Sequence, residues 1–197
     1  MELSVVYSRA LSGVTAPLVR VETHISGGLP AFNIVGLPET AVRESKDRVR
    51  SAIINSHFPF PDRRITVNLA PADLPKEGGR FDLPIAMGIL GASGQVPGEP
   101  LEKHEFLGEL ALGGSIRPVP GVIAAAGASR DAARCLAVAS QSAAAAVHVP
   151  GCHIIAPTDL LTICAHLKGA AALPAATLES RPQAAVYPDL ADVSGQH

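Results

Sequence analysis

The hydrophobic pattern of the chain changes its period near Pro38, and this change limits the folds that the chain can adopt. Upstream, apolar and polar residues alternate in three segments separated by glycines and prolines, which predicts a β-meander: 3–10, 18–25 and 31–35. Downstream, an apolar stripe with helical spacing runs from Ala41 to Ile54. A chain of this kind has to pack helices against a sheet.

The rest of the chain continues to alternate between the two periods. Further strands are expected at 64–69, 105–112, 115–119, 136–139 and 153–156. Further helices are expected at about 82–91, 122–134 and 158–167, with a short alanine-rich helix between the last two strands. Asp82 followed by Pro84 is a typical helix start, since proline is tolerated in the first turn. The sequence therefore predicts an α/β fold.

The charge balance excludes one class of function. The 197 residues contain 16 lysines and arginines and 18 aspartates and glutamates, for a net charge of −2. A free-standing nucleic-acid-binding protein is usually strongly basic, because its affinity comes from releasing counterions from phosphates. Only 4% of the residues are aromatic, so a base-stacking platform is poorly supplied. A local basic face is the remaining route to a nucleic acid.

No segment has the features of a membrane span or of an export signal. The longest stretch without charged residues, from Cys135 to Thr158, contains Gln141, His148 and Pro150. The second residue is a glutamate, where a secretory signal has positive charge. Three cysteines without CxxC spacing indicate reduced thiols. These features predict a cytoplasmic protein without membrane contact.

The lysines exclude a phosphate-binding loop of the Walker A type. That loop needs a Gly-Lys pair, in which glycine lets backbone amides wrap the phosphates and lysine reaches the terminal ones. The four lysines follow serine, proline, glutamate and leucine: Lys46, Lys76, Lys103 and Lys168. This chain is therefore expected to hydrolyse no ATP and to hold no cofactor of its own.

Three motifs carry a resemblance to a known family: Ser8–Gly13, Phe32–Pro38 and the glycine-rich segment Asp73–Ala86. With them, the sequence resembles the amino-terminal domain of the ComM/YifB family of magnesium-chelatase-like AAA+ ATPases over nearly its whole length. The resemblance implies a ribosomal protein S5 domain 2-like, or Lon-protease-like, form of the α/β (α+β) fold for residues 1–168. Residues 169–197, rich in proline and alanine, would then be a linker into an AAA+ module.

The same resemblance implies a function for the whole protein. It would be a homo-hexameric, ATP-dependent DNA helicase that promotes branch migration in homologous recombination and natural transformation, with ATP and Mg bound by the AAA+ module. The present domain would stack as a second ring that contacts single-stranded or branched DNA or neighbouring subunits. The alternative is an assembly or protein-client-binding module of a chelatase-like ATPase, without DNA contact.

Comparison with Lon proteases implies that the domain lacks their catalytic dyad. The segment Pro75–Asp82 lines up with the loop that carries the Lon nucleophilic serine, which puts Arg80 at that position. The segment Arg117–Ile123 lines up with the run that carries the general-base lysine, which puts Ile123 at the base position. Because a hydroxyl activated by an amine is the minimum for this chemistry, no catalytic residue is expected.

Eight basic residues are the candidates for a DNA or subunit contact. Six lie in and after the first predicted helix, against three acidic residues in the same stretch, and two lie in the glycine-rich loop: Arg43, Lys46, Arg48, Arg50, Arg63, Arg64, Lys76 and Arg80. The alternative for the helix is a solvated face with pairs such as Glu44 with Arg48. The alternative for Arg80 is a surface arginine paired with Glu77 or Asp82.

Histidines and cysteines near the carboxyl end form the remaining candidate for a ligand site: His148, Cys152, His153, Cys164 and His166. Their spacing matches no usual zinc finger or ribbon. Cys164 falls on the apolar side of the last predicted helix. Core thiols and surface histidines are therefore expected, and no metal.

Overall fold

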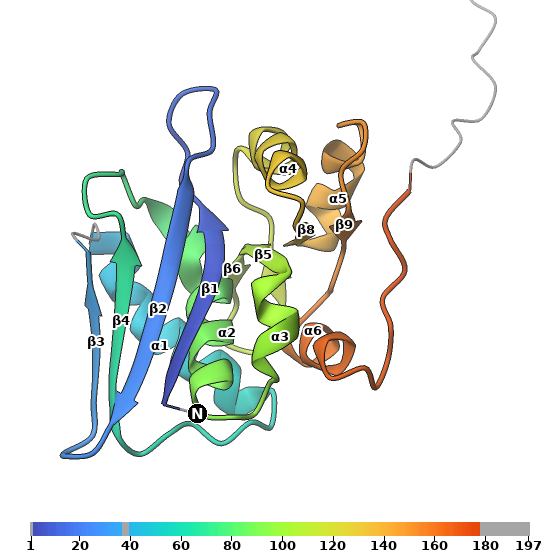
Figure 1. Cartoon of the computed structure of the whole chain (residues 1–197). Coiled ribbons are helices and arrows are strands. Elements are labelled where there is room, and N and C mark those ends of the chain that lie inside the picture. Colours follow the sequence, from blue (N-terminus) through green and yellow to red (C-terminus); the bar gives the residue numbers. More distant parts are fainter. Residues whose placement is uncertain (1, 37–39, 178–197) are drawn as a thin grey trace, which may run out of the picture.

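Seven strands form one mixed sheet in the order β3-β4-β2-β1-β5-β8-β9, and β6 and β7 form a small second sheet (Figure 1). The structure, a computed structural model, describes residues 2–36 and 40–177. The strands are β1 (Leu3–Arg9), β2 (Leu18–Ser26), β3 (Ala31–Val35), β4 (Arg64–Ala70), β5 (His104–Leu107), β6 (Glu109–Leu110), β7 (Ile116–Arg117), β8 (Cys135–Val138) and β9 (Ile154–Ile155). The helices are α1 (Thr40–Asn55), the 3-10 helix η1 (Gly78–Phe81), α2 (Asp82–Ala92), α3 (Gly98–Glu102), α4 (Val122–Asp131), α5 (Ser140–Ala146) and α6 (Leu160–Leu167). The predicted α/β class is confirmed, and the S5-like subtype stays a prediction.

The first three strands are not the predicted β-meander. Strands β1 and β2 do form an antiparallel pair, but β4 lies between β2 and β3 and runs parallel to β3. The alternation of apolar residues fixes which face of a strand is buried, not which strand lies beside it. Here β3, α1 and β4 form one β-α-β unit, in which the helix carries the chain back for a parallel pairing.

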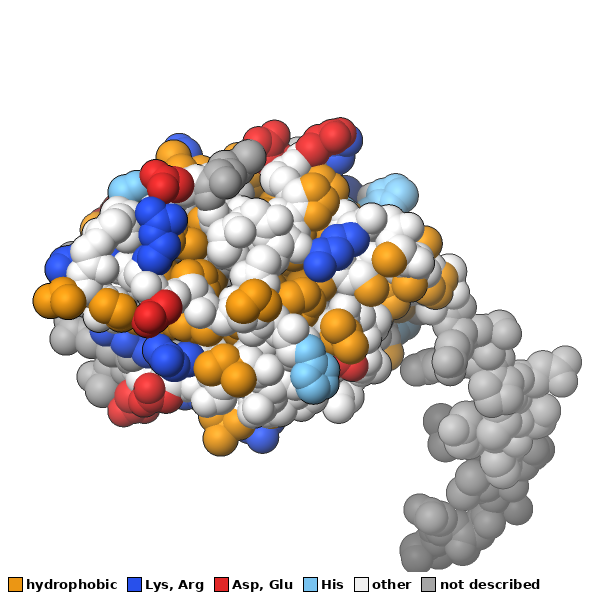
Figure 2. All heavy atoms as spheres, turned by 90° about the horizontal axis from the view of Figure 1, so that it is seen from below, with side chains coloured by type: hydrophobic (Ala, Val, Ile, Leu, Met, Phe, Trp, Pro, Cys, Tyr) orange, Lys and Arg blue, Asp and Glu red, His pale blue; other side chains and the backbone are white. Residues whose placement is uncertain are grey.

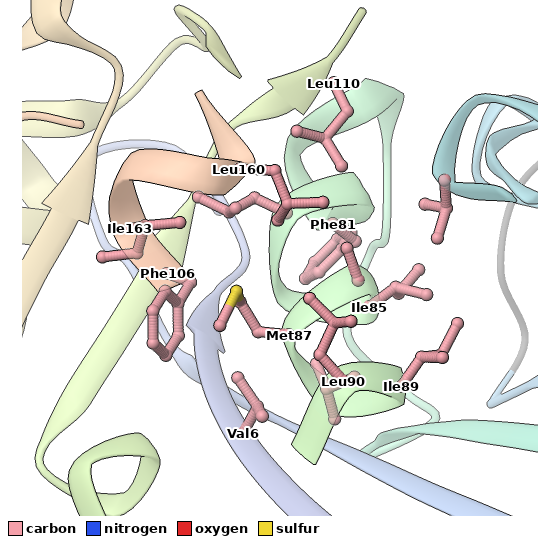
Figure 3. Packing of buried hydrophobic residues seen from close by; sticks show 14 of the residues in the cluster. Val6, Phe81, Ile85, Met87, Ile89, Leu90, Phe106, Leu110, Leu160 and Ile163 are labelled. Carbon is pink, nitrogen blue, oxygen red and sulfur yellow. The ribbon is translucent and has the colours of Figure 1, made fainter. Parts of the chain in front are cut away.

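Helix α2 lies at the centre of the core. All 11 of its residues are buried, as expected for a helix that is apolar on every side. At Gly88 and Gly91 a Cβ atom would lie 2.3 Å from the Thr23 Oγ1 and 2.6 Å from the Ser4 Oγ, so the two glycines allow α2 to approach β2 and β1 closely. Figure 3 shows apolar side chains of α2 facing Phe106 of β5 and residues of α6.

Within the described residues, helices cover both faces of the sheet only over β5, β8 and β9. Helices α4 and α5 pack their alanines against one face of β5, β8 and β9, while α2 and α6 cover the other. The outer face of β2 and β4 instead carries polar residues with partial or full exposure: Arg20, Glu22, His24, Thr66 and Asn68. Among the described residues, no helix is long and apolar enough to cross a membrane.

The segment predicted as one strand over 105–112 is two strands that belong to different sheets. The break falls at Gly108, whose amide donates to the Arg80 carbonyl (3.3 Å) and whose carbonyl accepts from the Leu83 amide (3.0 Å). These bonds tie the chain to the start of α2, so it leaves the main sheet at this point. Helix α3 was not predicted, because a five-residue segment with Pro100 inside shows no apolar stripe.

Part of the predicted linker is docked along the edge strand β9. The Leu173 amide donates to the His166 Nδ1 (3.0 Å), the Ala176 amide donates to the Ile154 carbonyl (2.8 Å), and Ala175 forms an antiparallel bridge with Ile155. This segment therefore covers the otherwise open edge of the sheet. Residues 178–197, the rest of the predicted linker, lie outside the described residues.

Candidate functional site

The glycine-rich loop and the segment 117–123 lie side by side. Arg80 joins them, because its guanidinium donates to the carbonyls of Pro120 (2.7 Å) and Arg9 (3.2 Å). The residue is only 6% exposed, and burial lowers the pKa of Arg80. The alternative of a surface arginine paired with Glu77 or Asp82 is therefore wrong. Arg80 binds backbone carbonyls inside the protein.

Lys76 also points inward. Its side chain is fully buried, and its Nζ donates to the carbonyls of Pro71 and Leu74 (3.0 Å to Leu74), both in its own loop. Burial lowers the pKa of the Lys76 amine. Ile123, the other position of the Lon comparison, is 58% exposed on the first turn of α4. Lys76 and Arg80 thus shape the loop from within.

Arg48 is the third candidate that faces the protein. Its Nε and one terminal nitrogen donate to the two carboxylate oxygens of Asp82, at 2.8 and 3.1 Å. Asp82 is fully buried and also accepts from the Leu110 amide (3.2 Å). The pair joins α1 to the first residue of α2.

The buried carboxyl of Asp82 predicts a pH dependence of stability. Burial, opposed by Arg48, raises the pKa of Asp82 to about 6. The folded protein then holds this proton more tightly than the unfolded chain, so the free energy of unfolding falls as the pH rises from about 4 to about 6, by up to about 3 kcal/mol. In Asp82→Asn this fall in the free energy of unfolding should be absent, because the carboxyl that titrates is gone. Urea titrations of both proteins between pH 4 and 8 measure it, and parallel pH profiles would contradict the assignment.

Three of the eight candidates gather at one end of the sheet: Arg50, Arg63 and Arg64. The Arg50 guanidinium lies over the Phe60 ring, 4.9 Å from its centroid. Arg63 is exposed and donates to the Glu2 carboxylate (3.0 Å), while Arg64 is exposed at the start of β4. Lys46 is half-buried on α1, and the side chain of Arg43 lies outside the described residues.

Two adjoining hollows flank the loop that carries Phe60, Pro61 and Arg63, which line both of them. The smaller, of about 240 Å³, also has Phe32 and Arg50 in its wall, and the larger is about 430 Å³. The rings of Phe32 and Phe60 lie 5.9 Å apart at an angle of 48°. We call this surface the arginine–phenylalanine groove. It combines planar cations with half-buried aromatic rings, the chemistry that holds phosphates and stacks on bases.

The groove has a mixed electrostatic character. Figure 2 views the molecule from the end that carries the loops 27–30 and 56–63, and it shows basic and acidic side chains interspersed, with apolar side chains between them. The hydrogen bond from Arg63, aided by its charge, lowers the pKa of Glu2. In the larger hollow, the Gln95 Oε1 is buried without a partner among the described residues. This polar atom has an unused capacity to accept a hydrogen bond.

A buried ionic cluster, which the sequence analysis did not identify, joins the two halves of the sheet. Arg9 at the end of β1 donates twice to Glu105 of β5, at 2.7 and 2.6 Å, and also binds the carbonyls of Ala16 and Ala128. Arg134 donates to the same carboxylate (3.3 Å) and lies over the Tyr7 ring. The only sequence signals are a charged residue inside each of two apolar strands.

The cysteines and histidines near the carboxyl end are separated. Cys164 is buried in the core, as predicted, and burial raises the pKa of its thiol to about 12. His148 and His153 are exposed, as predicted, but His166 is half-buried and accepts the Leu173 amide. Within residues 2–36 and 40–177, no three His, Cys, Asp or Glu side chains are grouped so that they could hold a metal ion.

Comparisons with known proteins give the relatives of the chain. The family model described as subunit ChlI of Mg-chelatase matches residues 21–142. Over its full length the chain is 50% identical to the uncharacterized protein YifB of Salmonella typhimurium and to the competence protein ComM of Haemophilus influenzae, of which it covers 39% and 40%. It is 38% identical to the uncharacterized protein Rv2897c of Mycobacterium tuberculosis, with 39% coverage of that protein. The chain thus spans about two fifths of the length of these relatives.

Proposed function

Since the chain belongs to the Mg-chelatase ChlI family, as its resemblance to ComM and YifB predicted, we propose that it is the amino-terminal domain of a ring-forming AAA+ ATPase. Two observations support this assignment. The similarity to the competence protein ComM extends over the whole of this chain, and ComM is more than twice as long as the chain. ATP and Mg would be bound by the AAA+ module, and the whole protein would be a homo-hexameric helicase that promotes branch migration in recombination and natural transformation.

The domain itself would contribute a DNA contact through the arginine–phenylalanine groove. The observation that carries this proposal is the position of Arg50 and Arg63 around the half-buried Phe60 ring. Each guanidinium can bind a backbone phosphate, and a base of a single strand can stack on an aromatic face. A weak contact of this kind gains affinity when a ring presents it six times.

The groove predicts how the affinity for DNA depends on two arginines. Arg50→Gln and Arg63→Gln are each expected to weaken the binding of a labelled single-stranded oligonucleotide about five- to tenfold at low salt. Each also lowers the slope of log affinity against log salt by about 0.7, because one phosphate contact is lost. Fluorescence anisotropy at several salt concentrations, with single-stranded and branched DNA, measures both effects.

Arg20→Gln is the matched control for these variants. Arg20 is an exposed arginine paired with a glutamate, Glu22 at 3.3 Å, but it lies on the outer face of β2 away from the groove. Its replacement should leave the affinity unchanged. Equal losses of affinity in all three variants, or DNA binding that does not respond to salt, would rule out a DNA contact through the groove. The assembly function would then be the remaining proposal.

An assembly or client-binding module is the second candidate, and exposed apolar side chains on neighbouring segments favour it. Three large apolar side chains are each about half exposed: Ile54 on α1, Leu112 in the β6–β7 turn and Leu161 on α6. Hydrogen bonds hold these segments together, from the Asn55 side-chain Nδ2 to the Leu112 carbonyl (2.8 Å) and from the Leu160 backbone amide to the Gly114 carbonyl (2.9 Å). Grouped apolar side chains at a surface are typical of protein contacts.

A further inference from the structure

We propose that a pocket at the amino ends of the parallel strands binds a phosphate group. The pocket has a volume of about 530 Å³, and five of its lining residues carry basic side chains: Lys103, His104, Arg130, Arg134 and His153. It shares no described lining residue with the arginine–phenylalanine groove, so the proposal stands independently of the DNA contact.

The topology of the sheet brings these residues together. Strands β5, β8 and β9 are parallel, so their amino ends share one edge of the sheet. Lys103 and His104 stand at the start of β5, Arg134 directly precedes β8, and His153 directly precedes β9. Arg130 lies in the last turn of α4, which ends at the same edge. Four chain segments thus each supply a nitrogen donor.

No carboxylate is among the described residues that line the pocket. The acidic partners lie around it. Glu105 is shared between Arg134 and Arg9, and Asp131 and Glu99 pair with Arg130 (2.8 Å) and Lys103 (2.6 Å). Asp131 and Glu99 are 69% and 79% exposed, and ion pairs at such exposed positions contribute little because water screens them. A phosphate therefore displaces these two carboxylates at low cost.

The carboxyl end of helix α4 opposes the binding of an anion, but more weakly than the basic side chains of the pocket favour it. Helix α4 ends at the pocket, and the partial negative charge at the carboxyl end of a helix repels an anion. Against this stand three cationic side chains that line the pocket, each of which can donate a charge-assisted hydrogen bond to a phosphate oxygen.

The two arginines are held in place before any ligand arrives. The Arg134 guanidinium lies 3.9 Å from the centroid of the Tyr7 ring and donates to Glu105 (3.3 Å). Arg130 donates to the Pro150 carbonyl (3.3 Å) as well as to Asp131. Planar forks held in this way lose little rotational freedom when they bind the oxygens of a phosphate. The ligand class is therefore a phosphate ester or free phosphate, bound through two or more oxygens.

A titration of the 197-residue chain with inorganic phosphate at constant ionic strength tests this proposal. Two-dimensional nitrogen–proton NMR should show saturable shifts of the amides of Ala133 and Gly151, which line the pocket. Arg130→Gln and Lys103→Gln should each weaken the binding about fivefold or more. Arg117→Gln is the matched control, since Arg117 is an exposed arginine paired with Glu109 at 3.3 Å and lies outside the pocket.

Parallel titrations with adenosine monophosphate and with a short single-stranded oligonucleotide identify the carrier of the phosphate. Tighter binding of either one, lost in Arg130→Gln but retained in Arg117→Gln, supports the pocket and names its natural ligand class. Shifts that do not saturate with any of the three, or equal losses in Arg130→Gln and Arg117→Gln, overturn the proposal.

Discussion

Replacement of Arg9 by leucine is expected to lower the free energy of unfolding by about 3–5 kcal/mol. The change leaves the fully buried Glu105 with Arg134 as its remaining ionic partner, at 3.3 Å and partly exposed. It also leaves the carbonyls of Ala16 and Ala128 without the guanidinium that binds them. A buried carboxylate that loses its closest cation is among the costliest single changes in a protein interior. Urea denaturation followed by circular dichroism measures the loss.

Two further variants separate this effect from a general loss of charge. Arg117→Gln removes an exposed ion pair and should cost less than about 1 kcal/mol. The double variant Arg9→Leu with Glu105→Leu removes both buried charges, and it should recover much of the stability lost by Arg9→Leu alone. A double variant less stable than Arg9→Leu would contradict the view that the unpaired carboxylate is the cause.

Arg80→Ala is expected to destabilise the fold by about 3–4 kcal/mol, because two charge-assisted hydrogen bonds to backbone carbonyls and the packing of a long, buried side chain are lost together. For a protein of this size the melting temperature should fall by about 10 °C. Differential scanning calorimetry measures the change. The position aligned with a protease nucleophile would thus be a structural support in this chain.

Arg80→Lys tests the geometry of this support. A lysine keeps the charge but has one nitrogen, so it cannot reach the Pro120 and Arg9 carbonyls as a planar fork does. It should recover less than half of the loss. If Arg80→Ala instead melts like the wild type and only weakens DNA binding, Arg80 is a ligand contact rather than a structural residue.

The elements with strong local signals could be predicted from the sequence. Helix α2 begins at Asp82 as expected from the Asp-Leu-Pro start, and the last helix was placed within two residues of α6, where Asp159 caps the Thr162 amide. Strand β4 buries Ile65, Val67 and Leu69 as their alternation indicates. These features depend on residues near one another in the chain, which is the information that periodicity and capping contain.

The direction of each basic side chain could not be predicted in the same way. A charge count treats Arg48 and Arg50 as equal members of a basic face, yet Arg48 turns to Asp82 and Arg50 to Phe60. Which of them faces inward depends on a carboxylate 34 residues later in the sequence. The low aromatic content likewise conceals that Phe32 and Phe60 meet at one surface.

The position of β4 between β2 and β3 has a consequence for the speed of folding. Strands β2 and β3 are separated by a short turn, but they never pair, so the quickest contact available to this part of the chain is not a native one. Strand β3 finds its place only after the chain has formed α1 and returned as β4. Loop closure over such separations slows folding, because its entropy is lost before the contacts form. The β1–β2 hairpin is the pairing that closes over a short loop, whereas β3 can pair only once β4 is in place beside it.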